Sequence, residues 1–182
     1  MASSDVTQKH PFLVLHDYGM GGLWWWIRAR SAREVLETFA WVEVITDPET
    51  LAGYKDQGLE EVDIDASRMP PGLDDLYAER AGQRGRAGFG VLADRDIAHL
   101  SLRGENEDGT PVDQLVEVGP DGRRLRQVEV AGDGTAVRSS PDDWMFNPPV
   151  VDLFDPALTD REISRGDFEA QWARARQEDS GL

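Results

Sequence analysis

The chain has 182 residues, contains no cysteine, and carries 35 acidic against 19 basic side chains, which gives a net charge of −16. Without cysteine, disulfide bonds, thiolate metal sites and cysteine nucleophiles are all excluded. The negative field disfavours nucleic-acid phosphates and anionic membranes as partners, and it would instead attract a basic protein.

The N-terminal residues MASSDVTQKHPFLVL lack the basic flank and the apolar core of a signal peptide. No apolar run approaches the roughly 20 residues that a membrane helix needs. We therefore expect a soluble, cytoplasmic protein. At this length roughly 70% of the surface of the unfolded chain can be buried, so one domain or two small ones can form without a covalent staple.

The first part of the chain, residues 11–81, is predicted to combine a β-hairpin with helices. The apolar run Phe12–Leu15 predicts a strand, and the aromatic-rich segment Leu23–Ala29 predicts the strand that returns. The glycine-dense segment 19–22 between them allows a tight turn, because glycine adopts positive φ without strain. A strand rather than a helix follows these glycines, so we interpret them as a hairpin turn and not as a phosphate-binding loop.

The returning strand contains three consecutive tryptophans, which cannot all face the same way. In a strand Trp24 and Trp26 share one face, and Trp25 lies on the other. One face must meet the helix that follows. Trp25 then either packs in the core or forms, together with Tyr18 near the turn, a recognition surface ringed by acids.

Local signals predict the other elements of this first part. Ser31 and Glu34 form a capping box, which predicts the start of a helix. Helices are expected at Ala32–Ala40, Pro48–Lys55 and Leu73–Arg80, a strand at Leu59–Ile64, and either a strand or a frayed helix end at Trp41–Thr46.

The basic, glycine-rich segment Gly82–Gly90 predicts the internal boundary. Residues 91–177 beyond it are expected to form an antiparallel sheet closed by a C-terminal helix that Ser164 caps. Strands are expected at Ile97–Leu102, Val112–Val118, Arg123–Val130 and Thr135–Arg138, followed by an irregular stretch over 141–158 that wraps across the sheet. The fold class is therefore α+β, in two units or in one fused domain.

No catalytic constellation is visible in the sequence. His16 and Asp17 could be a base and its orienter, but adjacent strand residues point to opposite faces. None of the three histidines has the spacing of a metal ligand, and neither a metal nor a cofactor is expected. The acids Glu60, Glu61, Asp63 and Asp65 form either a solvated strand face or a surface that steers a basic partner.

Two segments of the second half resemble a family of small bacterial proteins of unknown function that occur near toxin–immunity genes. Family members carry an R-K-V-E-(I/V)-F-x-D-G-(R/K) hairpin, matched here by Arg126–Glu129 and Asp133-Gly134 with Ala131 in place of an aromatic residue. They end in an E-I-S-x-x-E-F-x-x-x-W helix, matched by residues 162–172 with Asp167 in place of glutamate. The opening DYGMGGLWWWIRARS resembles that of actinobacterial proteins of unknown function.

These observations favour a non-catalytic, acidic protein-binding module. Together with the resemblance, they suggest an immunity-type inhibitor of a basic toxin or nuclease. From the aromatic and charge pattern, the expected partner-binding residues are Tyr18, Trp25, Glu60, Glu61, Asp63 and Asp65. One alternative is a small-ligand protein or enzyme with a pocket near His16 and Asp17. Another is a decoy whose carboxylates mimic a nucleic acid. The sequence does not indicate an oligomeric state.

Overall fold

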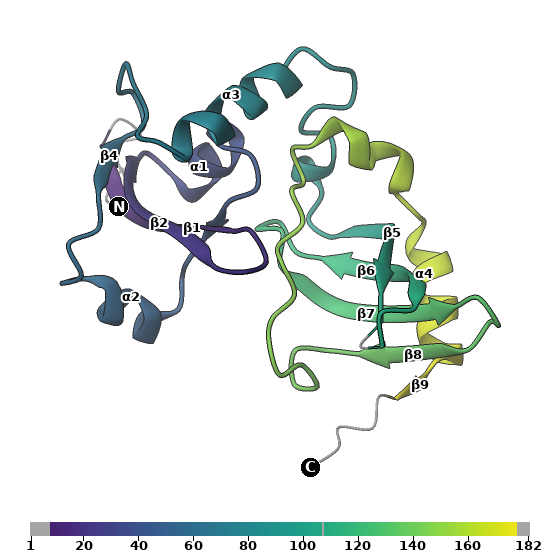
Figure 1. The fold of residues 1–182 in the computed structure, drawn as a ribbon. Coiled ribbons are helices and arrows are strands. Elements are labelled where there is room, and N and C mark those ends of the chain that lie inside the picture. Colours follow the sequence, from purple (N-terminus) through teal and green to yellow (C-terminus); the bar gives the residue numbers. More distant parts are fainter. Residues whose placement is uncertain (1–7, 107, 178–182) are drawn as a thin grey trace, which may run out of the picture. The chain divides into compact units, whose positions relative to one another are not determined.

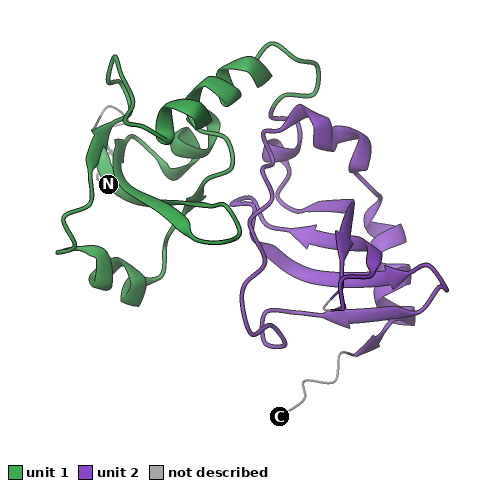
Figure 2. Cartoon of the chain, in the orientation of Figure 1, with its two compact units in different colours: residues 1–89 green, residues 90–182 purple. Residues whose placement is uncertain are grey.

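The computed structural model describes residues 8–106 and 108–177. The chain divides into two compact units, Met1–Phe89 (unit 1) and Gly90–Leu182 (unit 2), as Figure 2 shows. The division falls inside the segment Gly82–Gly90, where the sequence predicted a boundary. Each unit has its own sheet and its own helices, so the two are described separately.

Unit 1 is built on a four-stranded sheet in the order β3-β1-β2-β4. Its central hairpin pairs β1 (His10–Asp17) with β2 (Gly22–Ala29) in antiparallel register from His10↔Ala29 to Asp17↔Gly22. The short β3 (Glu43–Val44) extends β1 in antiparallel orientation, and β4 (Glu61–Asp63) runs parallel to β2. The predicted hairpin is therefore present, with a mixed sheet around it.

The helices of unit 1 lie on both sides of the hairpin (Figure 1). They are α1 (Ala32–Thr38), α2 (Pro48–Tyr54) and α3 (Leu73–Gln83). The predicted capping box starts α1, because the Ser31 hydroxyl accepts a hydrogen bond from the Glu34 amide at 3.1 Å. The helix ends before the predicted Ala40, whose amide donates instead to the Leu76 carbonyl of α3.

The tryptophans of β2 divide between the two faces of this sheet. Trp25 is only 4% exposed and belongs to the core that includes Val35 of α1 and Leu76 of α3. On the opposite face Trp24 stacks on Tyr54 of α2, with ring centroids 4.2 Å apart. Trp26, on that same face, lines a groove of about 610 Å³ with Pro11, Leu51, Ala52, Lys55, Gly58, Leu59 and Glu61.

Unit 2 contains a five-stranded sheet in the order β5-β6-β7-β8-β9. The strands are β5 (Ala98–Glu105), β6 (Pro111–Val118), β7 (Arg124–Ala131), β8 (Ala136–Ser139) and β9 (Arg176–Gln177). The first four form the predicted antiparallel meander, and β9 pairs in parallel with β8. The closing helix α4 (Arg165–Arg174) starts at the predicted cap Ser164 and contacts β6, β7 and β8. The α+β fold class is thus confirmed.

Two 3₁₀ helices complete unit 2, η1 (Leu92–Asp94) and η2 (Pro156–Arg161). The sequence predicted no regular structure at η2, yet Asp155 caps it and Pro156 is its first residue, a position where proline fits. The irregular segment before η2 lies against the β6–β7 turn, where the Val151 amide donates to the Gly122 carbonyl at 2.8 Å. Gly122 has φ of 84°, and a Cβ there would lie 2.4 Å from the Val151 carbonyl oxygen, so only glycine fits.

In the part of the chain that the structure describes, no helix combines the length and the apolar character needed to cross a membrane.

Candidate functional site

The predicted acidic surface lies at β4, where basic side chains already pair with most of its carboxylates. Glu61 lies 3.5 Å from Arg28, and Asp65 accepts from Arg30 at 2.6 Å. Lys9 bonds both Asp63 and Asp65. The Arg30 guanidinium, and after it Lys9, lowers the pKa of Asp65 to about 2.

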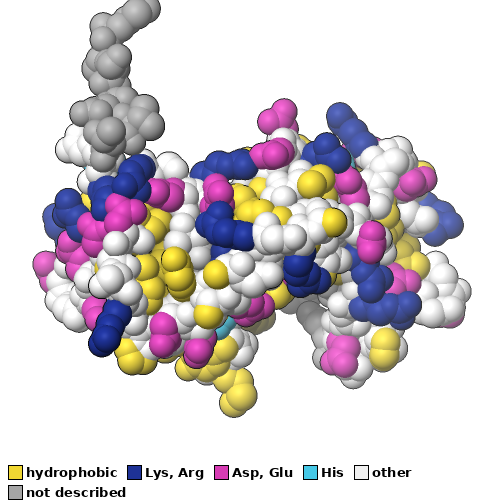
Figure 3. Space-filling model, turned by 90° about the horizontal axis from the view of Figure 1, so that it is seen from above, with side chains coloured by type: hydrophobic (Ala, Val, Ile, Leu, Met, Phe, Trp, Pro, Cys, Tyr) yellow, Lys and Arg dark blue, Asp and Glu magenta, His cyan; other side chains and the backbone are white. Residues whose placement is uncertain are grey.

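These ion pairs reduce the ability of the β4 carboxylates to attract a basic partner. They neutralise much of the field that was expected to steer a partner, because an ion pair has little net charge at a distance. Glu60 is exposed and makes no ion pair within residues 8–106 and 108–177. Figure 3 shows the same mixture more widely, with acidic and basic side chains interspersed on the face it draws. The edge at β4 is therefore a mixed-charge surface.

Trp25, expected as a partner-binding residue, is a core residue. It pairs across the hairpin with Val14 and points to the face that α1 and α3 cover, so that 4% of it is exposed. Tyr18, in contrast, is 57% exposed at the hairpin turn, where it was predicted to be accessible. The prediction that Trp25 and Tyr18 form one recognition surface is therefore wrong for Trp25, because Trp25 is buried.

A different tryptophan lies close to Tyr18. The Tyr18 ring lies 6.5 Å from the His16 ring, and His16 Nδ1 lies 2.8 Å from the Trp41 carbonyl oxygen. Leu23 is the cross-strand partner of His16, so its side chain shares that face. We call the exposed residues of this region the hairpin-tip surface: Tyr18 (57% exposed), Met20 (95%), Leu23 (39%) and Trp41 (41%).

The turn that presents Met20 is fixed by hydrogen bonds. The Tyr18 amide donates to the Gly21 carbonyl at 3.1 Å, and the Gly19 amide donates to Asp17 Oδ1 at 2.7 Å. Gly19 has φ of 87°, a conformation that glycine adopts at little cost. The apolar tip therefore has one defined backbone conformation before any partner arrives.

Trp41 is held in a left-handed conformation, with φ of 55°, which is unusual for a bulky residue. The neighbouring residue Ala40 is fixed to α3 by a backbone hydrogen bond. The indole Nε1 of Trp41 donates to Glu79 Oε1 at 2.6 Å. Strain of this kind persists only where the surroundings impose it, and it is concentrated at functional sites. The sequence predicted only a strand or a frayed helix end here, since no residue pattern signals a tryptophan at positive φ.

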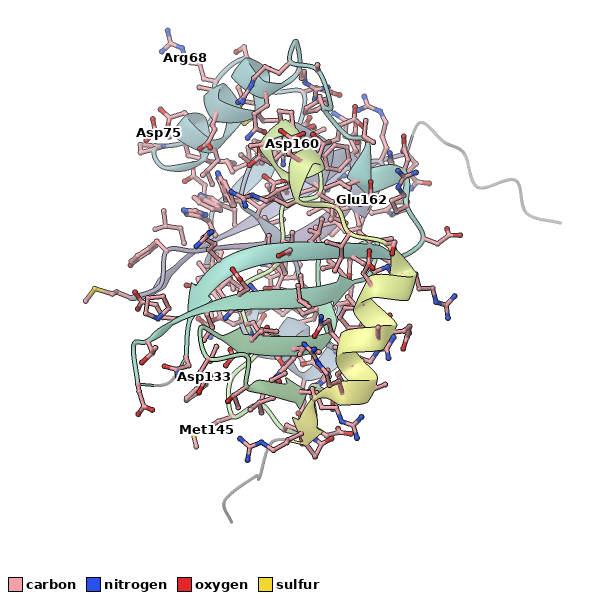
Figure 4. The ribbon with its side chains drawn as sticks, turned by 90° about the vertical axis from the view of Figure 1, so that its right-hand side faces the viewer. Arg68, Asp75, Asp133, Met145, Asp160 and Glu162 are labelled. Carbon is pink, nitrogen blue, oxygen red and sulfur yellow. The ribbon has the colours of Figure 1, made fainter. Side chains whose placement is uncertain are left out.

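Acidic residues border the hairpin-tip surface. Glu79 bonds Trp41, and Asp17 holds the turn. The first turn of α3 adds Asp74 and Asp75, of which Figure 4 labels Asp75. This turn lies beside the hairpin, since a Cβ at Gly72 would be 3.0 Å from the Leu23 side chain. The surface is therefore apolar at its centre and acidic at its rim.

His16 and Asp17 do not form a catalytic pair. The carbonyl of Trp41 can only accept, so His16 donates from Nδ1 to it. Asp17 accepts the Gly19 amide within the turn. The two side chains have separate structural partners and lie on opposite faces of β1. The alternative of an active site built on this pair has no support in the geometry.

A polar row crosses the sheet of unit 2 in the register of its strands. His99 of β5 pairs with Glu117 of β6, which pairs with Arg126 of β7. His99 Nε2 lies 3.1 Å from Glu117 Oε2, and Arg126 donates to both oxygens of Glu117 at 2.8 and 2.5 Å. Arg126 also donates to Glu169 of α4 at 2.6 Å. The hydrogen bonds from Arg126, ahead of the one from His99, lower the pKa of Glu117.

Aromatic rings of α4 cover this polar row. The guanidinium of Arg126 lies 5.0 Å from the centroid of the Phe168 ring and 4.9 Å from that of Trp172. Phe168 also lies 5.1 Å from the His99 ring. Arg126, Phe168 and Trp172 are residues of the two motifs that carry the family resemblance, so the motifs meet in one layer, which is consistent with a structural role for them.

His99 was not predicted as a site residue, because only the pairing of Glu117 with Arg126 has a local signal in the sequence. The Pro120–Gly122 turn places Glu117 and Arg126 opposite each other, but His99 and Glu117 are linked across a longer turn whose register the sequence does not fix. The pocket beside His99 has a volume of about 410 Å³. Within residues 8–106 and 108–177, no group of three or more His, Asp or Glu side chains has the arrangement of a metal site.

Comparison with known proteins gave no match: no family model, no curated protein and no solved structure is significantly similar to the chain.

Proposed function

We propose that the protein is a non-catalytic binding module that holds a basic protein partner on the hairpin-tip surface of unit 1. The observation that carries this proposal is the exposure of Met20 and Tyr18 on a turn whose backbone is fixed by hydrogen bonds. In this proposal the protein is cytoplasmic and of the immunity type, which means that it inhibits a basic toxin or nuclease.

The composition of the surface supports an interface. Exposed apolar side chains that gather at one place are typical of protein-interaction sites. Tryptophan and tyrosine are common binding hot spots, and methionine adapts its shape to a partner. Because the turn is already ordered, binding costs little further backbone entropy. A rigid tip with Tyr18, Met20 and Trp41 is thus suited to enter an apolar pocket of a partner.

The charges support a basic partner. Acidic side chains border the surface at Asp17, Glu79 and the start of α3, and the whole chain has a net charge of −16. Rim charges of one sign accelerate association with a partner of opposite sign, and added salt weakens this effect. A nucleic-acid decoy is less well supported, because Glu61, Asp63 and Asp65 are paired with basic side chains.

The test is calorimetry of the full chain with purified basic proteins encoded by its neighbouring genes. Met20→Ala and Trp41→Ala are expected to weaken binding at least about tenfold each, as hot-spot residues do. Met145→Ala is the matched control, since Met145 is 89% exposed on a loop of unit 2 (Figure 4). This variant is expected to bind like the unsubstituted chain.

Two results would overturn the proposal. If Met20→Ala and Met145→Ala weaken binding equally, the hairpin tip is not the binding site. If the association rate does not fall as salt is raised from 50 to about 500 mM, the acidic rim does not steer the partner. Failure of every basic protein tested to bind also counts against a basic partner.

A further inference from the structure

The pocket beside His99 in unit 2 is lined by charged side chains of both signs. Its lining residues are Asp96, Ile97, His99, Glu117 and Arg165. The first two precede β5 directly, and His99 belongs to it. The Ile163 amide donates to the His99 carbonyl at 2.9 Å, which places the start of α4, and with it Arg165, beside the same strand.

His99 is the most deeply buried side chain that lines this pocket. Its side chain is 8% exposed, and Nε2 faces the Glu117 carboxylate. Arg126 donates to both oxygens of Glu117, and this carboxylate accepts a hydrogen bond from His99 Nε2. His99 Nδ1 makes no hydrogen bond within the described part of the chain.

Charges of both signs line the pocket, and Arg165 also interacts electrostatically with Glu169 of α4. Asp96 and Arg165 line it, and among residues 8–106 and 108–177 neither makes an ion pair or a side-chain hydrogen bond. The neighbouring Arg95, in contrast, is paired with Glu162 at 2.9 Å. Arg165 is the first residue of α4, so the partial positive charge of the helix N-terminus adds to that of its guanidinium.

We propose that this pocket binds a small zwitterion of amino-acid size, with its ammonium on Asp96 and its carboxylate on Arg165. A simple anion would meet the carboxylates of Asp96 and Glu117, and a simple cation would meet Arg165, so a ligand with both charges fits best. The volume of about 410 Å³ is in the range of small-molecule sites, and Ile97 offers an apolar wall for a side chain. The proposal does not depend on the function proposed for unit 1.

The experiment titrates the full chain with glycine, L-alanine, L-leucine, L-glutamate and L-lysine, each up to about 10 mM, the range of weak small-ligand binding. Acetate and methylamine, which carry one charge each, are the ligand controls. At least one amino acid is expected to bind, at least about tenfold more tightly than either control, because each control lacks one ion pair. Saturation-transfer NMR provides a second readout that does not depend on the heat of binding.

Variants then locate the site. Asp96→Asn and Arg165→Gln are each expected to weaken binding at least about tenfold. Asp160→Asn and Arg161→Gln are the matched controls, because both residues are exposed in η2 and do not line the pocket. Met20→Ala is also expected to leave amino-acid binding unchanged, which separates this proposal from the function of unit 1.

The proposal is overturned by absence of binding for all five amino acids. The proposal is also overturned if acetate or methylamine binds as tightly as the best amino acid, since the site then recognises only one of the two charges of the ligand. Equal effects of Asp96→Asn and Asp160→Asn would place the binding elsewhere.

Discussion

In unit 1 the ion pairs at β4 lie at the solvent-exposed edge of the sheet, whereas in unit 2 the ion pairs of Arg126 lie between the sheet and α4. Asp65, which binds Arg30, has a side chain that is 52% exposed. Glu117, which binds Arg126, has a side chain that is only 13% exposed, and Trp172 covers the guanidinium. Exposed pairs contribute little to stability, and partly buried ones become costly to break.

Unit 1 also buries a guanidinium, between two of its helices. Arg80 is 1% exposed, and its NH2 group donates to the carbonyls of Leu36 and Phe39 at 2.9 Å. Its NH1 group donates to Gln83 at 2.7 Å. These bonds fix the C-terminal end of α1 to α3. The covered guanidinium of Arg80 therefore joins two helices in unit 1, whereas that of Arg126 joins the sheet to α4 in unit 2.

The largest expected effect is that of Arg80→Ala. It leaves two covered carbonyls without their donor and opens a cavity between α1 and α3, so we expect a loss of about 3 kcal/mol in the free energy of unfolding. Urea denaturation measures this loss. Arg84→Ala is the control, since the exposed Arg84 lies one turn further along and donates to the Glu37 carbonyl at 2.8 Å. A loss for Arg80→Ala no larger than that for Arg84→Ala would contradict the structural role of Arg80.

The second-largest expected effect compares the loss of one arginine in each unit. Arg126→Ala removes the partner of Glu117 and Glu169 and the contacts with Phe168 and Trp172, for an expected loss of about 2 kcal/mol. Arg30→Ala removes an exposed pair, and its effect should be much smaller and should fade in high salt. Both are measured by urea denaturation at two salt concentrations. Equal losses would mean that burial does not distinguish the two clusters.

The pH dependence of stability sharpens the same point. Because Arg126 lowers the pKa of Glu117 in the folded state, this carboxylate stabilises the fold above its unfolded pKa of about 4.3, and the contribution is lost as pH falls through the folded value. The difference in unfolding free energy between the unsubstituted chain and Glu117→Gln should therefore be largest near neutral pH and shrink below about pH 4. Asp121→Asn, which removes the exposed pair with Arg123, is the control for loss of a solvent-exposed ion pair in the same unit. The measurement runs from about pH 7 to about pH 3, a range that includes the usual pKa of glutamate. If the difference in unfolding free energy for Glu117→Gln stays constant over this range, the ion pair between Glu117 and Arg126 is contradicted.

Much of the fold could be predicted because its signals are local. Ser31 and Ser164 both start helices, since the capping pattern S-x-x-E or S-x-x-D acts within one helical turn. The glycines of the first turn gave the hairpin, and strand alternation separated Trp25 from Trp24 and Trp26. Which face is covered depends on where the chain goes after β2, and alternation alone does not contain that information.

The sites could be predicted only in part because they depend on distant contacts. Tyr18 is exposed because it lies in the predicted turn, but Trp41 joins it through a positive φ that no pattern signals. The pairing of Lys9 and Arg30 with the β4 acids needs a parallel strand contact that the sequence does not reveal. His99 likewise becomes a site only through the register of β5 on β6.

The smallest expected effect asks whether the helix caps also differ between the units. Ser31 accepts from the Glu34 amide at 3.1 Å, and Ser164 accepts from the Asp167 amide at 3.0 Å. A cap satisfies an amide of the first turn of its own helix. Its contribution to stability should therefore not depend on where the ion pairs of the unit lie. Ser31→Ala and Ser164→Ala should therefore each cost about 1 kcal/mol in urea denaturation. Amide exchange should accelerate at residue 34 in the first variant and at residue 167 in the second. A loss of unfolding free energy for Ser164→Ala well above that for Ser31→Ala would mean that the first turn of α4 also holds the polar row of His99, Glu117 and Arg126 in place. In that case the local contribution of the cap to stability could not be separated from that of the distant contacts in unit 2.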